Sequence, residues 1–110
     1  MLALPGNPRI FIYQEPVSML KGFEALSAIV EQHFSEAIIS GAFFVFINRQ
    51  RDRLKVLYWD NDGLAIWYKR LEKGSFPRSR KGKVTLSRCE FLMLLEGVTP
   101  KRVSRRYKVD

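Results

Sequence analysis

The sequence predicts an α+β fold, in which a small antiparallel sheet of about three to five strands packs against one long helix, followed by a shorter C-terminal helix and a basic tail. Short β-branched and aromatic segments recur through the middle of the chain, and helical periodicity is confined to one segment before them and one after. The length of 110 residues suits one domain with one hydrophobic core. We therefore expect a single α+β domain over residues 1–98 and a basic tail or short helix over residues 99–110.

The first two elements are predicted to be a short strand and the long helix. Residues 9–13 are β-branched and aromatic and lie between two prolines, as is typical of a strand. Ser18 is a candidate N-cap for a helix over residues 19–34. Apolar side chains recur there at helical spacing, so one stripe of this helix should face the core, namely Met19, Phe23, Leu26 and Val30.

Three strands of an antiparallel meander follow. Residues 42–47 are too apolar and too short for anything but a buried strand, and residues 53–59 alternate as a strand does. Residues 60–63 are typical of a turn, with Gly63 able to adopt positive φ, and residues 64–71 form the third strand.

The remainder is predicted to be a loop, a short strand and the second helix. Residues 73–83 contain glycine, proline and several cations and should form a loop, and residues 84–86 can form a short strand. Ser87 and Glu90 have the spacing of a capping box, which predicts a helix over residues 88–96.

Composition favours a basic globular protein. Lys and Arg number 19 against 11 acids, and the resulting formal charge of +8 attracts polyanions such as nucleic acid, although many small basic proteins bind none. Cys89 is the single cysteine, so no intramolecular disulfide and no cysteine zinc cluster is expected, which fits a cytoplasmic protein. The N-terminal residues do not resemble a signal peptide, and no apolar run approaches the roughly 18 residues of a membrane helix.

Catalytic chemistry is not expected. Asp60 and Asp62 could belong to a two-metal site, but bonding to their own backbone in a hairpin turn is the favoured interpretation. His33 and Cys89 have no identifiable partner and are expected to pack in the interior. No glycine-rich phosphate loop is present. We therefore predict a protein that is not an enzyme and has no catalytic residue, metal site or cofactor.

One face of the predicted sheet is a candidate nucleic-acid surface. If residues 61–63 form a three-residue loop, Trp59 lies opposite Ala65, Leu57 opposite Trp67, and Lys55 opposite Lys69. Cations on that face would bind phosphates and the indoles would stack on bases, and the two opposed lysines would repel unless an anion lay between them. This face would carry Arg53, Lys55, Trp59, Trp67 and Lys69.

An alternative interpretation of that face remains open, because both tryptophans could belong to the core with the stems of the cations lying over them. Other cations are candidates for sequence-independent phosphate contacts, or serve solubility alone. They are Arg49 and Arg51 in the predicted turn, Arg78, Arg80, Lys81 and Lys83 in the loop, and Lys101, Arg102, Arg105 and Arg106 in the tail. Lys21, near the start of the long helix, is a possible anion site.

Three stretches resemble a known family. They read VSMLKGFEAL over residues 17–26, GAFFVFINRQRDRLKVLYWD and GLAIWYKRLEKGSF over residues 41–60 and 63–76, and LLEG over residues 94–97. In order and spacing they are similar to the TnpB accessory proteins, encoded by the second reading frame of the sixty-six group of bacterial insertion sequences. The resemblance covers nearly the whole chain, and it does not extend to the RNA-guided nuclease of the same name, which is far longer.

The resemblance implies a protein encoded beside a larger transposase and needed for efficient movement of the element, with no catalytic residues to transfer. The family has an acid and a cation where this chain has Ser18 and Leu20, so the anion site at Lys21 lacks a neighbouring cation. We predict a non-catalytic accessory protein of transposition that contacts DNA, with the transposase as partner and no membrane. The alternative is an adaptor that binds the transposase without touching DNA.

Overall fold

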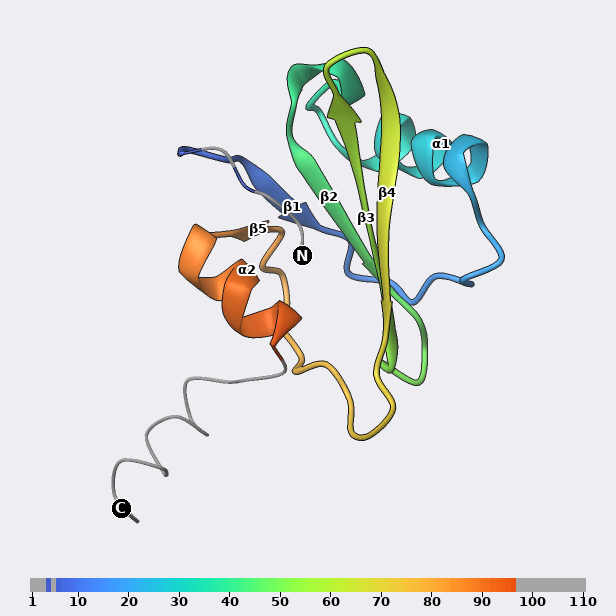
Figure 1. Cartoon of the computed structure of the whole chain (residues 1–110), viewed down its shortest axis with the longest axis vertical. Coiled ribbons are helices and arrows are strands. Elements are labelled where there is room, and N and C mark those ends of the chain that lie inside the picture. The colour runs from blue at the N-terminus through green and yellow to red at the C-terminus, as the bar shows by residue number, and fades with distance from the viewer. Residues whose placement is uncertain (1–3, 5, 97–110) are drawn as a thin grey trace.

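The computed structural model describes residue 4 and residues 6–96 as a sheet with a helix on each side (Figure 1). Its elements follow the predicted order, with one additional short 3₁₀ helix before the second strand. They are β1 (Ile10–Ile12), α1 (Phe23–His33), η1 (Ile38–Ser40), β2 (Phe43–Ile47), β3 (Arg53–Asp60), β4 (Gly63–Arg70), β5 (Thr85–Leu86) and α2 (Arg88–Leu95). The α+β class is confirmed. The predicted tail over residues 99–110 lies outside the described residues.

The five-stranded sheet has the order β4-β3-β2-β1-β5 and is mixed. The predicted meander is confirmed, since β2, β3 and β4 pair antiparallel in sequence order, and β5 pairs antiparallel with β1. The prediction of a wholly antiparallel sheet is wrong, because β1 pairs parallel with β2. Parallel neighbours need a long crossover connection, and the segment containing α1 and η1 supplies it.

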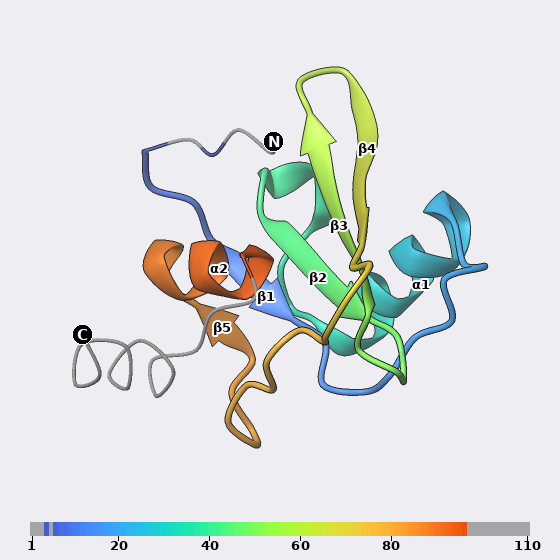
Figure 2. The same ribbon diagram turned by 60° about the horizontal axis from the view of Figure 1, so that its bottom comes forward.

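Two hydrophobic clusters lie on opposite faces of the sheet. On one face, Phe91 of α2 packs in a cluster with Val45 and Val56; on the other, Leu26 of α1 packs with Phe44. Figure 2 shows α1 and α2 on either side of the sheet. Every residue of β2 is buried, as expected for a central strand covered on both faces. The sheet is therefore the middle of three layers, not one of two.

The long helix is shorter than predicted. It begins at Phe23, after the N-cap Gly22, and has 11 residues. Ser18 is not its N-cap, because the Ser18 hydroxyl accepts a hydrogen bond from the backbone N–H of Leu20 in the preceding loop. Leu26 and Val30 are buried as predicted, whereas Phe23 is 48% exposed.

The second helix has the predicted capping box. The Ser87 hydroxyl accepts from the Glu90 backbone N–H at 3.0 Å, and the Glu90 carboxylate accepts from the Ser87 backbone N–H at 2.8 Å. These two bonds satisfy donors that a helix start leaves without intrahelical partners. In the part of the chain that the structure describes, neither α-helix is long and apolar enough to cross a membrane.

The hairpin between β3 and β4 differs from the prediction by one residue. Asp60 pairs with Gly63, so the turn has two residues, and Asn61 rather than Gly63 adopts positive φ, at 61°. Asparagine tolerates that left-handed conformation better than most residues, which makes the tighter turn possible. A slip of one residue moves every side chain of one strand to the other face relative to its predicted partners. The side chains of the predicted surface therefore do not all lie on one face of the sheet.

Candidate nucleic-acid interface

The predicted binding face is divided between the two sides of the sheet. Trp59 lies opposite Leu64 and Lys55 opposite Tyr68, on the side covered by α1, whereas Trp67 lies opposite Val56 on the side covered by α2. The predicted pairs of Trp59 with Ala65, Leu57 with Trp67 and Lys55 with Lys69 are therefore wrong. Arg53, Lys55 and Trp59 share one face, and Trp67 and Lys69 share the other.

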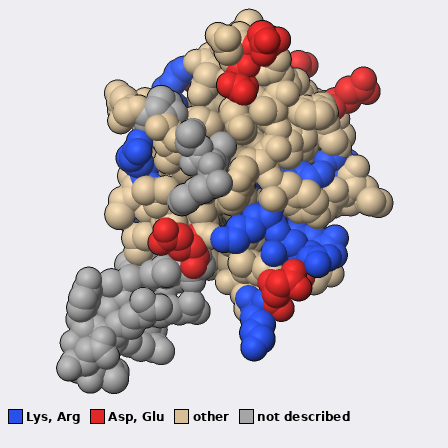
Figure 3. Space-filling view, in the orientation of Figure 1, with Lys and Arg blue, Asp and Glu red and all other residues tan. Residues whose placement is uncertain are grey.

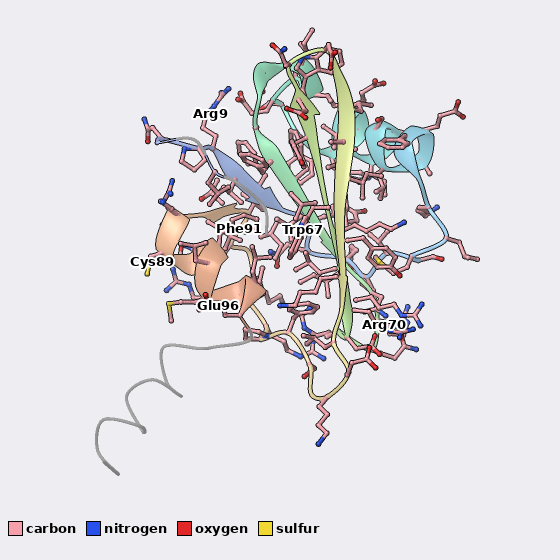
Figure 4. All side chains as sticks on the ribbon, in the orientation of Figure 1. Arg9, Trp67, Arg70, Cys89, Phe91 and Glu96 are labelled. Carbon is pink, nitrogen blue, oxygen red and sulfur yellow. The ribbon has the colours of Figure 1, made fainter. Side chains whose placement is uncertain are left out.

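The two tryptophans are both half-buried and are not adjacent stacking surfaces. Trp67 packs against the hydrophobic cluster under α2, which agrees with the alternative interpretation of it as a core residue. The Trp59 indole N–H donates to the backbone oxygen of Asn61 at 3.2 Å and so helps to hold the hairpin turn. Figure 4 shows Trp67 near the middle of β4, well away from Arg70 at its end.

Lys55 has a structural role. Only 8% of it is exposed, and its ammonium group donates to the backbone oxygens of Met19 and Lys21, both at 2.9 Å. The same group lies 4.9 Å from the centre of the Tyr68 ring, at cation–π distance. These contacts tie the loop before α1 to the sheet and leave the ammonium group buried away from solvent.

Arg51 and Lys69 also bind backbone carbonyls. The Arg51 guanidinium donates to the oxygens of Phe76 and Pro77 at 3.1 and 2.7 Å, which fixes the loop after β4 to the β2–β3 turn. Partial burial, and then the nearby charge of Arg78, lower the pKa of Arg51. The Lys69 ammonium donates to the backbone oxygen of Leu95 at 2.8 Å, at the end of α2, where the helix dipole favours a cation.

Arg49 and Arg53 line an open groove at the end of the sheet, between the loop before α1 and the β2–β3 turn. This basic groove has a volume of about 840 Å³ and is lined also by Leu20 and Tyr68. Among the described residues, neither arginine makes an ion pair or a side-chain hydrogen bond. Lys and Arg side chains gather over this end of the sheet in Figure 3.

Arg53 also lies directly opposite Arg70 across β3 and β4. Like charges in that position destabilise a sheet unless a counter-charge lies near. Arg70 has a partner in Glu72 at 3.2 Å, an exposed ion pair of small energetic value. The sequence predicts repulsion between Lys55 and Lys69. In the structure the opposed like charges are instead Arg53 and Arg70, at the rim of the basic groove.

The loop over residues 78–83 supplies a second group of cations. Arg78, Arg80 and Lys81 are exposed, while Lys83 forms an ion pair with Glu90 at 3.3 Å. Arg78 joins the two groups, because it lines a hollow of about 60 Å³ together with Arg49 and Arg51. The predicted loop is confirmed, and its cations are continuous with those of the basic groove.

Lys21 is exposed and immediately precedes Gly22, the N-cap of α1. No side chain caps this helix start, and Glu24 in its first turn already supplies the negative charge that a helix N-terminus favours. The anion site at Lys21 stays a prediction. Lys101, Arg102, Arg105 and Arg106 lie outside the described residues, and their role stays a prediction too.

The acids do not gather into a metal site in the part of the chain that the structure describes. No group of three or more metal-ligating side chains is found there; Asp60 is the last residue of β3 and Asp62 lies in the hairpin turn. Cys89 is exposed, so its predicted burial is wrong. His33 is exposed as well, with its ring 5.3 Å from that of Tyr13.

Sequence reasoning missed Leu20, Tyr68 and Arg70 as parts of this surface. Leu20 is 97% exposed and lines the basic groove, although a leucine in a predicted helix is normally assigned to the core. Tyr68 and Arg70 share a face with Arg53, which only the correct register of the hairpin could have indicated.

Comparison with known proteins gives the family. The family model described as "IS66 Orf2 like protein" matches residues 8–105. Uncharacterized protein y4jC of Sinorhizobium fredii is 34% identical over 100 residues, which cover 89% of this chain and 86% of that protein. Uncharacterized protein y4hO of the same bacterium is 31% identical over 100 residues, covering 89% and 87%. No solved structure matches. The chain therefore belongs to the IS66 Orf2-like family, which associates it with the transposition of IS66 insertion sequences.

Proposed function

We propose that this protein assists transposition by binding DNA phosphates through the basic groove and the 78–83 loop. The observation that carries the proposal is the pair of arginines, Arg49 and Arg53, which line the groove without an acidic partner among the described residues. Arg70, which lies opposite Arg53 across the two strands, adds a third positive charge beside the groove. A phosphate between Arg53 and Arg70 would relieve their repulsion, and neutralising a phosphate releases counterions.

The contact is expected to be independent of DNA sequence. The two α-helices of the described chain lie on opposite faces of the sheet, so they do not form the adjacent pair that a helix-turn-helix places in the major groove. Phosphate contacts by Arg and Lys position a protein on DNA without identifying its bases. The Tyr68 ring, 47% exposed in the same groove, offers a stacking surface to an unpaired base.

A titration with labelled duplex and single-stranded DNA tests the proposal. We expect micromolar or tighter binding at about 50 mM salt, with a steep loss of affinity by about 200 mM. Absence of binding at the lower salt concentration would contradict the proposal. Equal affinity for unrelated sequences is expected, because the contacts are to phosphates.

The second candidate function is that of an adaptor that binds the transposase. The exposure of Leu20 and Phe23 favours it. Leu20 is 97% and Phe23 48% exposed, and both lie in the segment over residues 17–26. Exposed apolar side chains that lie close together are typical of a protein-binding surface. The aromatic strands are poorer candidates, because Trp67 packs against the core and replacing it would damage the fold.

Co-purification with the transposase of the same element, after nuclease treatment, tests the adaptor function. The Phe23→Ser variant should lose the complex and keep its affinity for DNA, because Phe23 does not line the basic groove. Ile39→Ser is the matched control, because Ile39 is 66% exposed on η1, away from the groove. Retention of the complex by Phe23→Ser, or equal loss in both variants, argues against this surface.

A further inference from the structure

The outer edge of β4 has no partner strand among the described residues, and we propose that a second copy of this chain pairs with it antiparallel. The strand order places β4 at the end of the sheet, beyond β3 (Figure 1). The inference goes beyond DNA binding, since it concerns how the protein assembles with itself.

The backbone hydrogen bonds of the sheet fix which groups of β4 point outward. The Asn48 backbone N–H donates to the Arg53 oxygen at 3.1 Å, so Arg53 and every second residue of β3 after it direct their backbone toward β2. The intervening residues of β3 bond to β4, and their partners there are odd-numbered. Leu64, Ile66, Tyr68 and Arg70 consequently present their N–H and C=O groups to the free edge.

The middle of this edge lacks the usual protection against strand addition. In native proteins, charges, prolines, bulges or short length protect an edge strand from pairing with another strand. Residues 64–68 contain no charge and no proline, and the pairing of β3 with β4 runs from Arg53–Arg70 to Asp60–Gly63 without a bulge. An eight-residue strand of this kind is a template for another strand.

The charges at the two ends of β4 select a second copy in one register. Asp62 lies in the turn before the strand and Arg70 at its end. Figure 3 shows acids at the upper end of the molecule and, at the lower end, a group of cations with an acid among them. An antiparallel pair centred on Ile66 brings Asp62 of each copy next to Arg70 of the other and sets Ala65 opposite Trp67. An antiparallel pair centred on Trp67 would use the same outward-facing N–H and C=O groups. It would bring Glu72 of one copy next to Asp62 of the other, and these two acids repel each other.

The dimer should be weak. One added strand buries less surface than the roughly 1,600 Å² of a standard interface, and the net charge of +8 on each chain opposes association. We expect a monomer–dimer equilibrium that shifts over the micromolar concentration range.

Sedimentation of the full chain without DNA, over a range of protein concentrations, tests the proposal. Asp62→Lys and Arg70→Glu each create two repulsive contacts per dimer, so each should weaken dimerisation about tenfold or more. The double variant Asp62→Lys/Arg70→Glu restores both attractive contacts and should dimerise like the natural sequence. Glu31→Lys, which makes the same charge reversal on α1 away from the edge, should change nothing.

A monomer at every concentration overturns the proposal. So does a dimer that either single variant leaves intact, or one that the double variant fails to restore, since each of these indicates another interface. Circular dichroism of the variants checks that they fold, as expected for exposed side chains. Because DNA is absent, a negative result leaves the DNA-binding proposal untouched.

Discussion

The ammonium group of Lys55 lies inside the molecule, where it donates to the backbone oxygens of Met19 and Lys21. The sequence predicts that Lys55 and Lys69, on the sheet face, and Arg51, in the turn, contact nucleic acid. All three bind backbone carbonyls instead. No local pattern separates such a cation from an exposed one, because the carbonyls come from segments at least 25 residues away in the sequence. The side-chain donors of Arg49 and Arg53 have no such partner among the described residues, and their phosphate-binding role stays a prediction.

Replacing Lys55 by methionine should destabilise the protein. The backbone oxygens of Met19 and Lys21 would lose the donor that they accept from, which should lower the free energy of unfolding by about 1–3 kcal/mol. Urea unfolding measures this loss. Lys69→Met is the control and should cost less, because Lys69 is less buried than Lys55 and bonds to one carbonyl instead of two. Unchanged stability of Lys55→Met together with weaker DNA binding would contradict the structural role.

Among the helices and strands, those with a short-range sequence signal were predicted best. The alternation of residues 53–59 and the apolar run over residues 42–47 located β3 and β2, and Ser87 and Glu90 marked the start of α2. These signals depend on neighbours in the sequence. The predicted start of α1 was wrong. Ser18 is a residue type that often caps helices, but its hydroxyl accepts from the Leu20 N–H in a loop that Lys55 holds in place.

The capping box of α2 should make stability depend on pH. The pKa of Glu90 is lowered, chiefly by the hydrogen bond from the Ser87 backbone N–H and further by Lys83, although burial opposes the shift. A carboxylate whose folded pKa lies below its unfolded value stabilises the protein above the unfolded value of about 4.3. That contribution is lost as the pH falls from there through the lowered folded pKa.

Glu90→Gln should therefore lower the free energy of unfolding by about 0.2–0.5 kcal/mol at neutral pH, because glutamine can keep the capping hydrogen bond and only the charge of a half-exposed side chain is lost. The difference from the natural sequence should shrink toward zero as the pH falls below about 4.3 and the carboxylate becomes protonated. Thermal unfolding followed by circular dichroism at several pH values measures it. A difference of constant size between pH 7 and pH 3 would show that the charge of Glu90 contributes nothing.

The β3–β4 hairpin depends on the conformation of Asn61. Its φ of 61° is poorly tolerated by β-branched residues. We expect Asn61→Val to destabilise the protein by about 1–2 kcal/mol and Asn61→Gly to leave stability nearly unchanged, in denaturant titrations. Equal stability of the two variants would mean that the turn is not the two-residue turn described here. Since this turn sets the register, it also decides which side chains share a face with Arg53.

The whole molecule combines features that no single segment predicts. The parallel pairing of β1 with β2 requires the chain between them to cross one face of the sheet, and the two helices then cover opposite faces. That arrangement places the β2–β3 turn beside both the loop before α1 and the 78–83 loop. The basic groove exists because these three segments meet, which is why composition predicted cations in excess but not where they gather.

The dependence of DNA affinity on salt, measured for selected variants, tests the central claim that Arg49 and Arg53 bind phosphates. The slope of log affinity against log salt falls by about 0.9 for each duplex phosphate contact removed. We predict a slope smaller by about two units in the Arg49→Gln/Arg53→Gln variant. Arg9→Gln, which removes a cation paired with Glu36 away from the groove, should leave the slope unchanged. Equal slopes for the natural sequence and the double arginine variant would contradict the claim.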